Sequence, residues 1–414
     1  MTPGLRPLDA ALDARWPRTV ALLGDLVRAR ASSGHETAAQ EIVAARLREA
    51  GCEVDVFDVD AARLSVLPGW GPTRLEYAGR PDVVGIIRGT GGGRSLILNA
   101  HVDAVAPGPA ELWERDAWSA EIVGDRLYGR GSWDDKAGVA MLVWLVEALR
   151  DAGTKLAGDL IVESVIEEEN SGNGTLACAE RGYRADAAVV IDGRGPGSAV
   201  IAHGGQLWFR VMARGRSAAA VESRLGVNAI ELLLPVIEHL HALEADLARD
   251  AEAPFDALAH PAQLNVGVIA GGVTPTTVPG TASLDCHLAF SAPHRLEQVK
   301  AEVTETVARA DTAATVEFLS LQVPPFVAPE SDALLAALDR AQRPIIGTSL
   351  ERRTIAGFGD LRHFQRGGAT PCCLYGVTAG NSPHAPNEWV DLEPLPRAAR
   401  ILAAFVCDWC GIAS

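Results

Sequence analysis

Acidic residues and histidines stand where several predicted strands end. Most of them follow a short apolar run that is typical of a buried strand, such as SLILNA, DLIVESVI or DAAVVID. In an open α/β sheet, ligands bind at the carboxyl ends of the strands. We therefore expect these side chains to converge on one site, which comprises His101, Asp103, Asp134, the run Glu167-Glu168-Glu169, Asp192 and His384.

The convergence of carboxylates and imidazoles predicts a site for divalent metal ions. Several carboxylates in one place repel one another unless a cation lies between them. His with Asp or Glu, and without a nearby Cys, suits Zn²⁺ or a similar divalent metal. Any one of these residues alone would be read as a loop residue, a helix cap or part of a solvated acidic run. Their recurrence at successive strand ends favours the metal site.

The elements that must position these residues alternate between helix and strand. Helical spacing covers 10–50, with a break at Ser32-Ser33-Gly34. The run Thr90-Gly91-Gly92-Gly93 predicts a hairpin between two of the strands. This alternation is typical of an α/β layer with a mostly parallel sheet. The strands are expected at 52–59, 83–89, 95–100, 159–166 and 186–192, with a helix at 138–153.

The pattern changes in the middle of the chain. Alternating apolar segments that predict strands are combined with two amphipathic helices, at 228–250 and 296–309. This combination predicts a compact α+β unit of domain size. We expect an inserted domain at 207–320 within a larger domain formed by 1–206 and 321–414.

Composition excludes several classes of protein. The 414 residues are 48% hydrophobic and 22% charged, which is typical of a globular chain with more than one domain. A formal net charge of −16 disfavours binding to nucleic acids and anionic membranes. The seven cysteines have no disulfide-framework spacing, and we find neither a signal peptide nor an apolar run of membrane-spanning length. We predict a cytoplasmic protein that binds neither nucleic acid nor membrane.

Four ordered motifs resemble those of the di-zinc amidohydrolases: LILNAHVDAV, LYGRGSWDDKAGVAML, SVIEEENSGNGTLA and PHAPNEWVDLEPL. That family includes acetylornithine deacetylase, succinyl-diaminopimelate desuccinylase, aminoacylase and carboxypeptidase G. The resemblance covers nearly the whole chain, and GVNAIELL and NVGVIAGG are similar to parts of the family's lid. It implies a zinc-hydrolase catalytic domain with an inserted lid and dimerisation domain, which pairs two chains into a homodimer.

The resemblance also implies two divalent metal ions per chain, zinc or else cobalt or manganese. Asp134 would bridge the two ions. The remaining ligands would be His101 and Asp192 for one ion, and Glu169 and His384 for the other.

Two further acidic residues have implied roles beside the metals. Glu168 would be the general base, because a carboxylate next to the cations can take the proton of a water and deliver it to the leaving amine. Asp103 would hold the imidazole of His101 in its orientation, as carboxylates commonly do for metal-binding histidines.

Several positions depart from the family's pattern. Where the lid usually carries a histidine that stabilises the oxyanion in a partner subunit, this sequence has Ala219, so either the natural enzyme lacks the group or the chain is a slowed variant. Thr276 replaces a common Asn, and His287 replaces a common Arg that favours a substrate carboxylate. Arg362 and the pair Arg352-Arg353 are candidate anion-binding residues, with a surface charge pair as the alternative.

Three functions compete at this point. The leading one is a metal-dependent hydrolase of a small-molecule amide, of the N-acyl amino acid deacylase type. A dipeptidase, or an aryl-amine or carbamoyl hydrolase on the same scaffold, is the alternative among enzymes. A catalytically silent binding protein is the third. The complete ligand set with Glu168 argues against silence, whereas Ala219 argues weakly for it.

Overall fold

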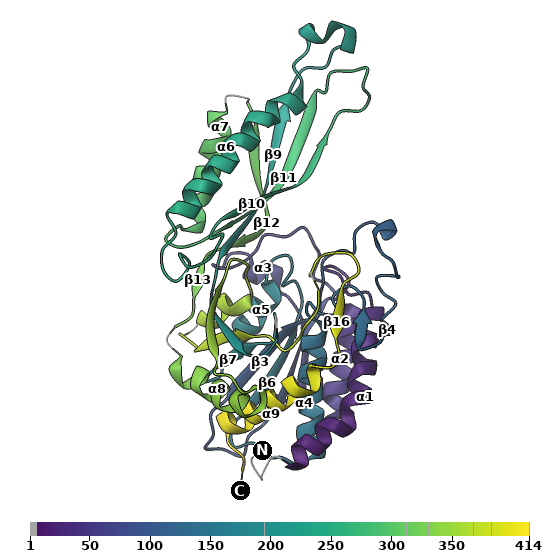
Figure 1. Cartoon of the computed structure of the whole chain (residues 1–414), viewed down its shortest axis with the longest axis vertical. Helices are drawn as coiled ribbons and strands as arrows, with labels where there is room; N and C mark the ends of the chain where they lie inside the picture. Colours follow the sequence, from purple (N-terminus) through teal and green to yellow (C-terminus); the bar gives the residue numbers. More distant parts are fainter. Residues whose placement is uncertain are drawn as a thin grey trace.

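A computed structural model describes residues 6–193, 195–310, 313–329, 331–366, 368–381 and 383–413 of the chain. Figure 1 shows a larger α/β body that contains both ends of the chain and an elongated unit that projects from it. We call the projecting unit the lid. Its strands are β9 (Gly205–Arg214), β10 (Gln263–Gly271), β11 (Thr281–Phe290) and β12 (Thr315–Val323).

The larger body is built on a sheet that holds nine strands among the described residues. They are β1 (Glu53–Asp58), β2 (Pro81–Ile87), β3 (Leu96–His101), β6 (Leu160–Val165), β7 (Ala188–Val190), β8 (Ser198–His203), β13 (Phe326–Val327), β14 (Glu351–Ile355) and β15 (Cys372–Tyr375). The order is β1-β2-β6-β3-β7-β15-β8-β13, and β14 pairs with β8. The central strands β6, β3, β7 and β15 run parallel. Every residue of β3 and β6 is buried, as expected for a sheet covered on both faces.

The predicted hairpin at Thr90-Gly91-Gly92-Gly93 is wrong. β6 lies between β2 and β3, antiparallel to the first and parallel to the second. The backbone N–H groups of Thr90 and Gly91 donate to the carbonyls of Leu156 and Ala157, which precede β6. The glycines permit a turn, but β2 and β3 each pair with β6, which comes later in the chain, and not with each other.

Helices cover both faces of this sheet (Figure 1). One core contains residues of the first helix, α1 (Arg6–Arg28), of the last helix, α9 (Leu395–Cys410), and of α4 (Lys136–Asp151). The residues of α4 from Lys136 to Leu149 are all buried. A second core on the opposite face includes Cys178 of α5 and Leu361 of η4. The helices of the body are α1 (Arg6–Arg28), α2 (Thr37–Glu49), α3 (Ala61–Leu64), η2 (Ala110–Leu112), α4 (Lys136–Asp151), α5 (Asn173–Arg181), α8 (Asp332–Ile346), η4 (Asp360–Gln365) and α9 (Leu395–Cys410).

The lid has a core of its own. Its antiparallel sheet has the order β10-β11-β9-β12, and α6 (Ala229–Arg249) and α7 (Leu296–Arg309) pack on one face of it. Alternation along β9 buries Leu207, Phe209 and Val211 against these helices. A short helix, η3 (Ala220–Leu225), lies at the far end of the lid. The predicted fold class, an α/β body with an inserted α+β lid, is confirmed.

A small third sheet lies beside the body. It consists of β4 (Glu121–Val123), β5 (Arg126–Tyr128) and β16 (Trp389–Asp391), in the order β16-β5-β4. Because β5 and β16 pair, the segment before Asp134 is held against the segment after His384. In the part of the chain that the structure describes, we find no helix long and apolar enough to cross a membrane.

Candidate metal centre

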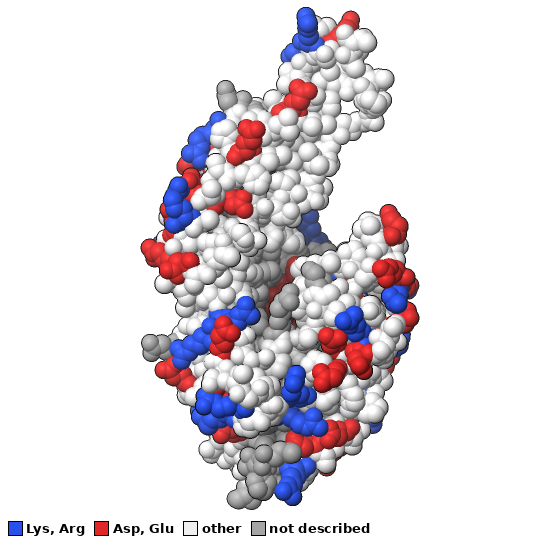
Figure 2. Space-filling model, in the orientation of Figure 1, with Lys and Arg blue, Asp and Glu red and all other residues white. Residues whose placement is uncertain are grey.

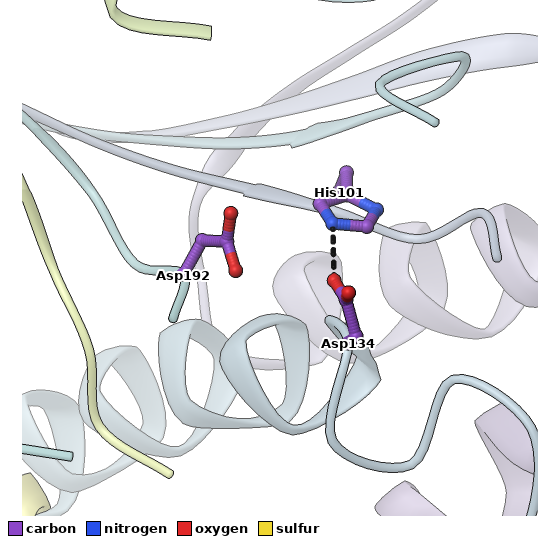
Figure 3. A group of neighbouring side chains, drawn as sticks. All are labelled: His101, Asp134 and Asp192. Carbon is purple, nitrogen blue, oxygen red and sulfur yellow. Dashed lines mark hydrogen bonds and ion pairs between the residues drawn. The ribbon is translucent and has the colours of Figure 1, made fainter. Parts of the chain in front are cut away.

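The predicted ligands lie where the elements of the body end. His101 is the last residue of β3, Asp192 follows β7 by two residues, and the acidic run 167–169 follows β6. Asp134 precedes α4, and His384 lies in the loop before β16. The side chains of His101, Asp134 and Asp192 face one another (Figure 3). The structure therefore brings together side chains from five separate segments.

Asp134 occupies the centre of this cluster. Its Oδ1 lies 3.1 Å from Nε2 of His101, and its Oδ2 lies 3.4 Å from Nε2 of His384. Nε2 of His384 is in turn 2.9 Å from Oε2 of Glu169. Two groups with ligand atoms within 4.8 Å of one another result: His101, Asp134 and Asp192, and Asp134, Glu169 and His384. Asp134 belongs to both groups and directs one oxygen toward each histidine.

The electrostatics of the cluster fit divalent cations. Burial raises the pKa of Asp192 to about 7, and the neighbouring Asp134 adds to the effect. Although burial opposes a charge on His384, Asp134 and Glu169 raise its pKa to about 11. Oε1 of Glu169 is buried and has no hydrogen-bond partner among the described residues. The imidazoles thus take up protons to offset crowded carboxylates, a role that two divalent ions would fill with the same nitrogen and oxygen donors.

Glu168 and Asp103 lie beside the ligands. Oε2 of Glu168 is 4.0 Å from Nε2 of His101, and burial raises the pKa of Glu168 well above its ordinary value. Oδ1 of Asp103 accepts a hydrogen bond of 3.2 Å from the backbone N–H of Glu168 and lies 3.5 Å from Nδ1 of His101. Its Oδ2 accepts from the hydroxyl of Ser33 at 2.9 Å. Asp103 therefore links the orientation of His101 to the backbone that carries Glu168.

A buried ion pair that sequence reasoning missed joins two of the ligand loops. Oε2 of Glu388 accepts from Nη1 of Arg130 at 2.7 Å, and Nη2 of Arg130 donates to the carbonyl of His384 at 2.9 Å. Oε1 of Glu388 accepts from the backbone N–H groups of Trp133 and Asp134, at 3.1 and 3.3 Å. Both residues stand inside motifs quoted above, but only the fold shows that they are partners.

A second missed network holds the acidic run. Glu167 has a backbone φ of +67°, which is uncommon for a residue with a side chain. Its Oε1 accepts from Nη2 of Arg80 at 2.6 Å, and Arg80 also makes two bonds to the carboxylate of Glu36, at 2.6 and 2.7 Å. Oε2 of Glu167 accepts from Tyr77, Asn170 and Ser171. These contacts fix the turn that presents the next two residues, Glu168 and Glu169.

A cavity of about 470 Å³ opens beside the metal cluster. Figure 2 shows the corresponding hollow between the lid and the body, with acidic side chains at its floor. His287 of the lid reaches this cavity, and its Nε2 lies 2.5 Å from Oε1 of Gln206. Its lining comprises Trp133, Asp134, Glu168, Glu169, Asp192, Gly193, Ser198, Val200, Gln206, His287, Arg353, Ile355, Gly357, Phe358, Leu374, Gly376, Pro383 and His384.

Ala219, Thr276 and Arg362 are among the predicted positions that lie outside the lining of this cavity. Ala219 and Thr276 sit together at the far end of the lid, where Ala219 bridges to Thr277 and the carbonyl of Thr276 accepts from Ala220. That end points away from the body (Figure 1). Arg362 is buried and donates to the carbonyls of Ser171 and Gly359, each at 3.0 Å. The roles of these three residues stay predictions.

Comparison with known proteins decides the family. Residues 97–408 match the model of the peptidase family M20/M25/M40, which is most of the chain. The chain belongs to this family. The resemblance to di-zinc amidohydrolases is thereby confirmed, and the protein is a hydrolytic enzyme that acts on C–N bonds.

The chain is similar to a deformylase and to a desuccinylase over most of its length. One is the N-formyl-4-amino-5-aminomethyl-2-methylpyrimidine deformylase of Bacillus subtilis, 29% identical over 90% of this chain and 89% of the relative. Another is the succinyl-diaminopimelate desuccinylase of Cupriavidus taiwanensis, 28% identical over 84% of this chain and 88% of the relative. Both relatives are matched over most of their length.

Solved structures confirm the fold. A di-peptidase of Saccharomyces cerevisiae superposes with a TM-score of 0.80 at 14% identity, over 99% of both chains. A Bacillus subtilis protein described as a dinuclear metal binding peptidase of family M20 superposes with a TM-score of 0.59 at 15% identity, over 95% of this chain and 98% of that one.

Proposed function

We propose that the protein is an amidohydrolase that removes the acyl group from a small N-acyl compound with the help of two divalent metal ions. Zinc is the metal that we propose. The placement of Asp134 carries this proposal, because its two oxygens face two separate groups of ligands next to Glu168. His101 and Asp192 would complete one metal site, and Glu169 and His384 the other.

The residues around the metals supply the rest of the mechanism. When bound, the two cations activate a water molecule and polarise the scissile carbonyl. Glu168 is placed to accept the proton of that water and to donate it later to the leaving amine. Asp103 orients both His101 and the backbone of Glu168, so that ligand and base keep a fixed relation.

We propose that the lid, predicted at 207–320 and built on strands that span 205–323, pairs two chains into a homodimer. Strand β10 is an edge of the lid sheet, and an exposed edge is a template for pairing with a second chain. Large apolar side chains are exposed around it, among them Val221, Leu225, Ile269 and Val273. Such pairing would bring the far end of the lid, with Ala219 and Thr276, toward the partner's cavity.

The substrate is proposed as an N-formyl, N-acetyl or N-succinyl amine. The curated relatives, a deformylase and a desuccinylase, support this class. The seven cysteines are all free, which supports our proposal of a cytoplasmic location.

The test combines metal reconstitution with a panel of N-acyl compounds, dipeptides, carbamoyl compounds and aryl amides. Glu168→Gln should keep the full metal content and lower kcat by about 10²- to 10⁴-fold, because it removes a base and no metal ligand. Glu41→Gln, an exposed change on α2, is the matched control and should leave kcat unchanged. Near-native turnover by Glu168→Gln would exclude the role assigned to Glu168, and hydrolysis of dipeptides alone would make the protein a dipeptidase.

A further inference from the structure

A histidine of the lid lines the cavity, and a chain of hydrogen bonds holds its imidazole. His287 on β11 is half-buried, and its direct neighbour on strand β9 is Trp208. Gln206 stands two residues before Trp208, in a diagonal position from which its side chain reaches His287. Nε2 of Gln206 donates to the backbone carbonyl of Ala356 at 2.7 Å, and its Oε1 lies 2.5 Å from Nε2 of His287.

These contacts determine which nitrogen of His287 carries the proton. A carbonyl oxygen can only accept, so the group of Gln206 that faces Ala356 is the amide NH₂. The amide oxygen of Gln206 therefore faces His287, and Nε2 of the imidazole is the donor in that bond. A neutral imidazole has one donor and one acceptor nitrogen. Nδ1 of His287 is thus an acceptor, and it makes no hydrogen bond with any residue that the structure describes.

The surroundings of His287 favour the neutral imidazole. Burial lowers its pKa below the ordinary value of 6.5, and no carboxylate of the described chain forms an ion pair with it. The ring of Trp208 meets the imidazole edge to face, with the ring centroids 6.3 Å apart. Since the N–H of His287 is taken by Gln206, this residue has no donor left for an oxyanion and does not replace the histidine that position 219 lacks.

The rest of the lining suits an apolar molecule. Val200, Ile355, Phe358 and Leu374 line the same cavity, as is common in sites where a few polar groups orient a largely apolar ligand. An acceptor in such a site discriminates against ligands that leave it unpaired, because the acceptor has lost its water. A formyl or acetyl group carries no donor, so a donor for Nδ1 of His287 must belong to the leaving amine.

We propose that His287 is a specificity-determining residue, whose Nδ1 accepts a hydrogen bond from an uncharged N–H or O–H group on the leaving amine of the substrate. This inference rests on the proposed function and specifies its substrate class. The preferred amines have an apolar body with an uncharged donor on the part that faces the lid. An anion is disfavoured at that place, because its lone pairs would meet the lone pair of Nδ1.

The first measurement reads the tautomer without any turnover. Nitrogen-15 NMR of the metal-loaded enzyme with labelled histidines distinguishes protonated from unprotonated ring nitrogens, and His287→Phe identifies the signals of His287. We expect the proton on Nε2 and a bare Nδ1 at pH 8. A proton on Nδ1 at this pH, in the neutral ring or in an imidazolium, would refute the proposal.

The second measurement is the binding of three N-acetylbenzylamines to the metal-loaded Glu168→Gln protein, whose ligands stay intact. Their rings carry a primary amino, a dimethylamino or a carboxylate group. One neutral hydrogen bond corresponds to about 2- to 12-fold in affinity, and the amino compound should bind more tightly than the dimethylamino compound by that factor. Adding His287→Phe should remove this preference without weakening the carboxylate compound. His260→Phe, at an exposed histidine of the lid, is the control and should change neither.

The binding results separate this inference from the proposed function. If wild type hydrolyses no N-acyl compound, but the preference for the amino compound is present and is lost in His287→Phe, the proposed function fails and the acceptor site stands. Equal binding of the amino and dimethylamino compounds refutes the acceptor site. A preference of the same size in His287→Phe, or weaker binding of the carboxylate compound to that variant, refutes it as well.

Discussion

Replacing Arg80 with methionine should damage the metal centre although Arg80 touches no predicted ligand. Arg80 is 6% exposed, and the two carboxylates it binds, those of Glu36 and Glu167, are fully buried. Glu167 precedes Glu168 and Glu169 and holds a positive φ, a conformation that surrounding contacts must maintain. Without the guanidinium, the turn loses its strongest contact and two buried carboxylates lose their counter-charge.

The size of the effect follows from the burial of the network. Removing one partner of a buried ion pair costs about 3–5 kcal/mol, because the other charge is left without compensation. Burial raises the pKa of Glu36 even with Arg80 present. In the variant this pKa should rise further, so that Glu36 is neutral at low pH and charged at high pH. The loss of stability should therefore be larger at pH 8 than at pH 5.5.

The assay must separate a positioning role from a purely structural one. The visible spectrum of the cobalt-substituted enzyme reports the ligand geometry, and metal content and kcat are measured on the same samples. We expect Arg80→Met to alter the spectrum, lower the bound cobalt and reduce kcat at least tenfold, with partial recovery in Arg80→Lys. Arg48→Met, an exposed change on α2, is the control. An unchanged spectrum and a kcat within twofold of wild type, in a protein that only melts earlier, would refute the reasoning.

Two further predictions concern the lid and the buried core. If paired lids bring position 219 to the partner's metals, Ala219→His should raise kcat at least tenfold with little change in KM, since one oxyanion donor contributes about 10²–10³ in kcat. Unchanged turnover, or a monomer in light scattering, would contradict this prediction. Glu163→Gln should stabilise the fold at pH 8 by up to roughly 3 kcal/mol and have little effect below pH 4.5. Burial raises the pKa of Glu163 from 4.5 to about 7, so the stability that its protonated form contributes is lost as the pH rises through 7. Thermal melts of variant and wild type across this range measure the difference.

The structure brings the predicted ligands together, and several of them carry a local signal in the sequence. An apolar run that ends in His101 or Asp192 identifies both a buried strand and the polar residue at its end. The order of the strands has no such signal. The glycines at 91–93 therefore predicted a hairpin between β2 and β3, whereas β6 lies between these two strands. Likewise, Arg130 and Glu388 are 258 residues apart, and the sequence around either residue does not indicate its partner.

The ion pairs that support the centre join segments that are remote in the sequence. Glu388 holds the loop of Asp134 against that of His384, and Arg80 holds the turn before Glu168 against the helix start at Glu36. The turn is also tied to the lid, since Asn170 donates to Glu167 at 3.1 Å and accepts from Ser320 of β12 at 2.7 Å. Because each support crosses between elements, the positions of the ligands depend on the packing of the whole body. We therefore expect a substitution at a support to weaken metal binding before the fold itself is lost.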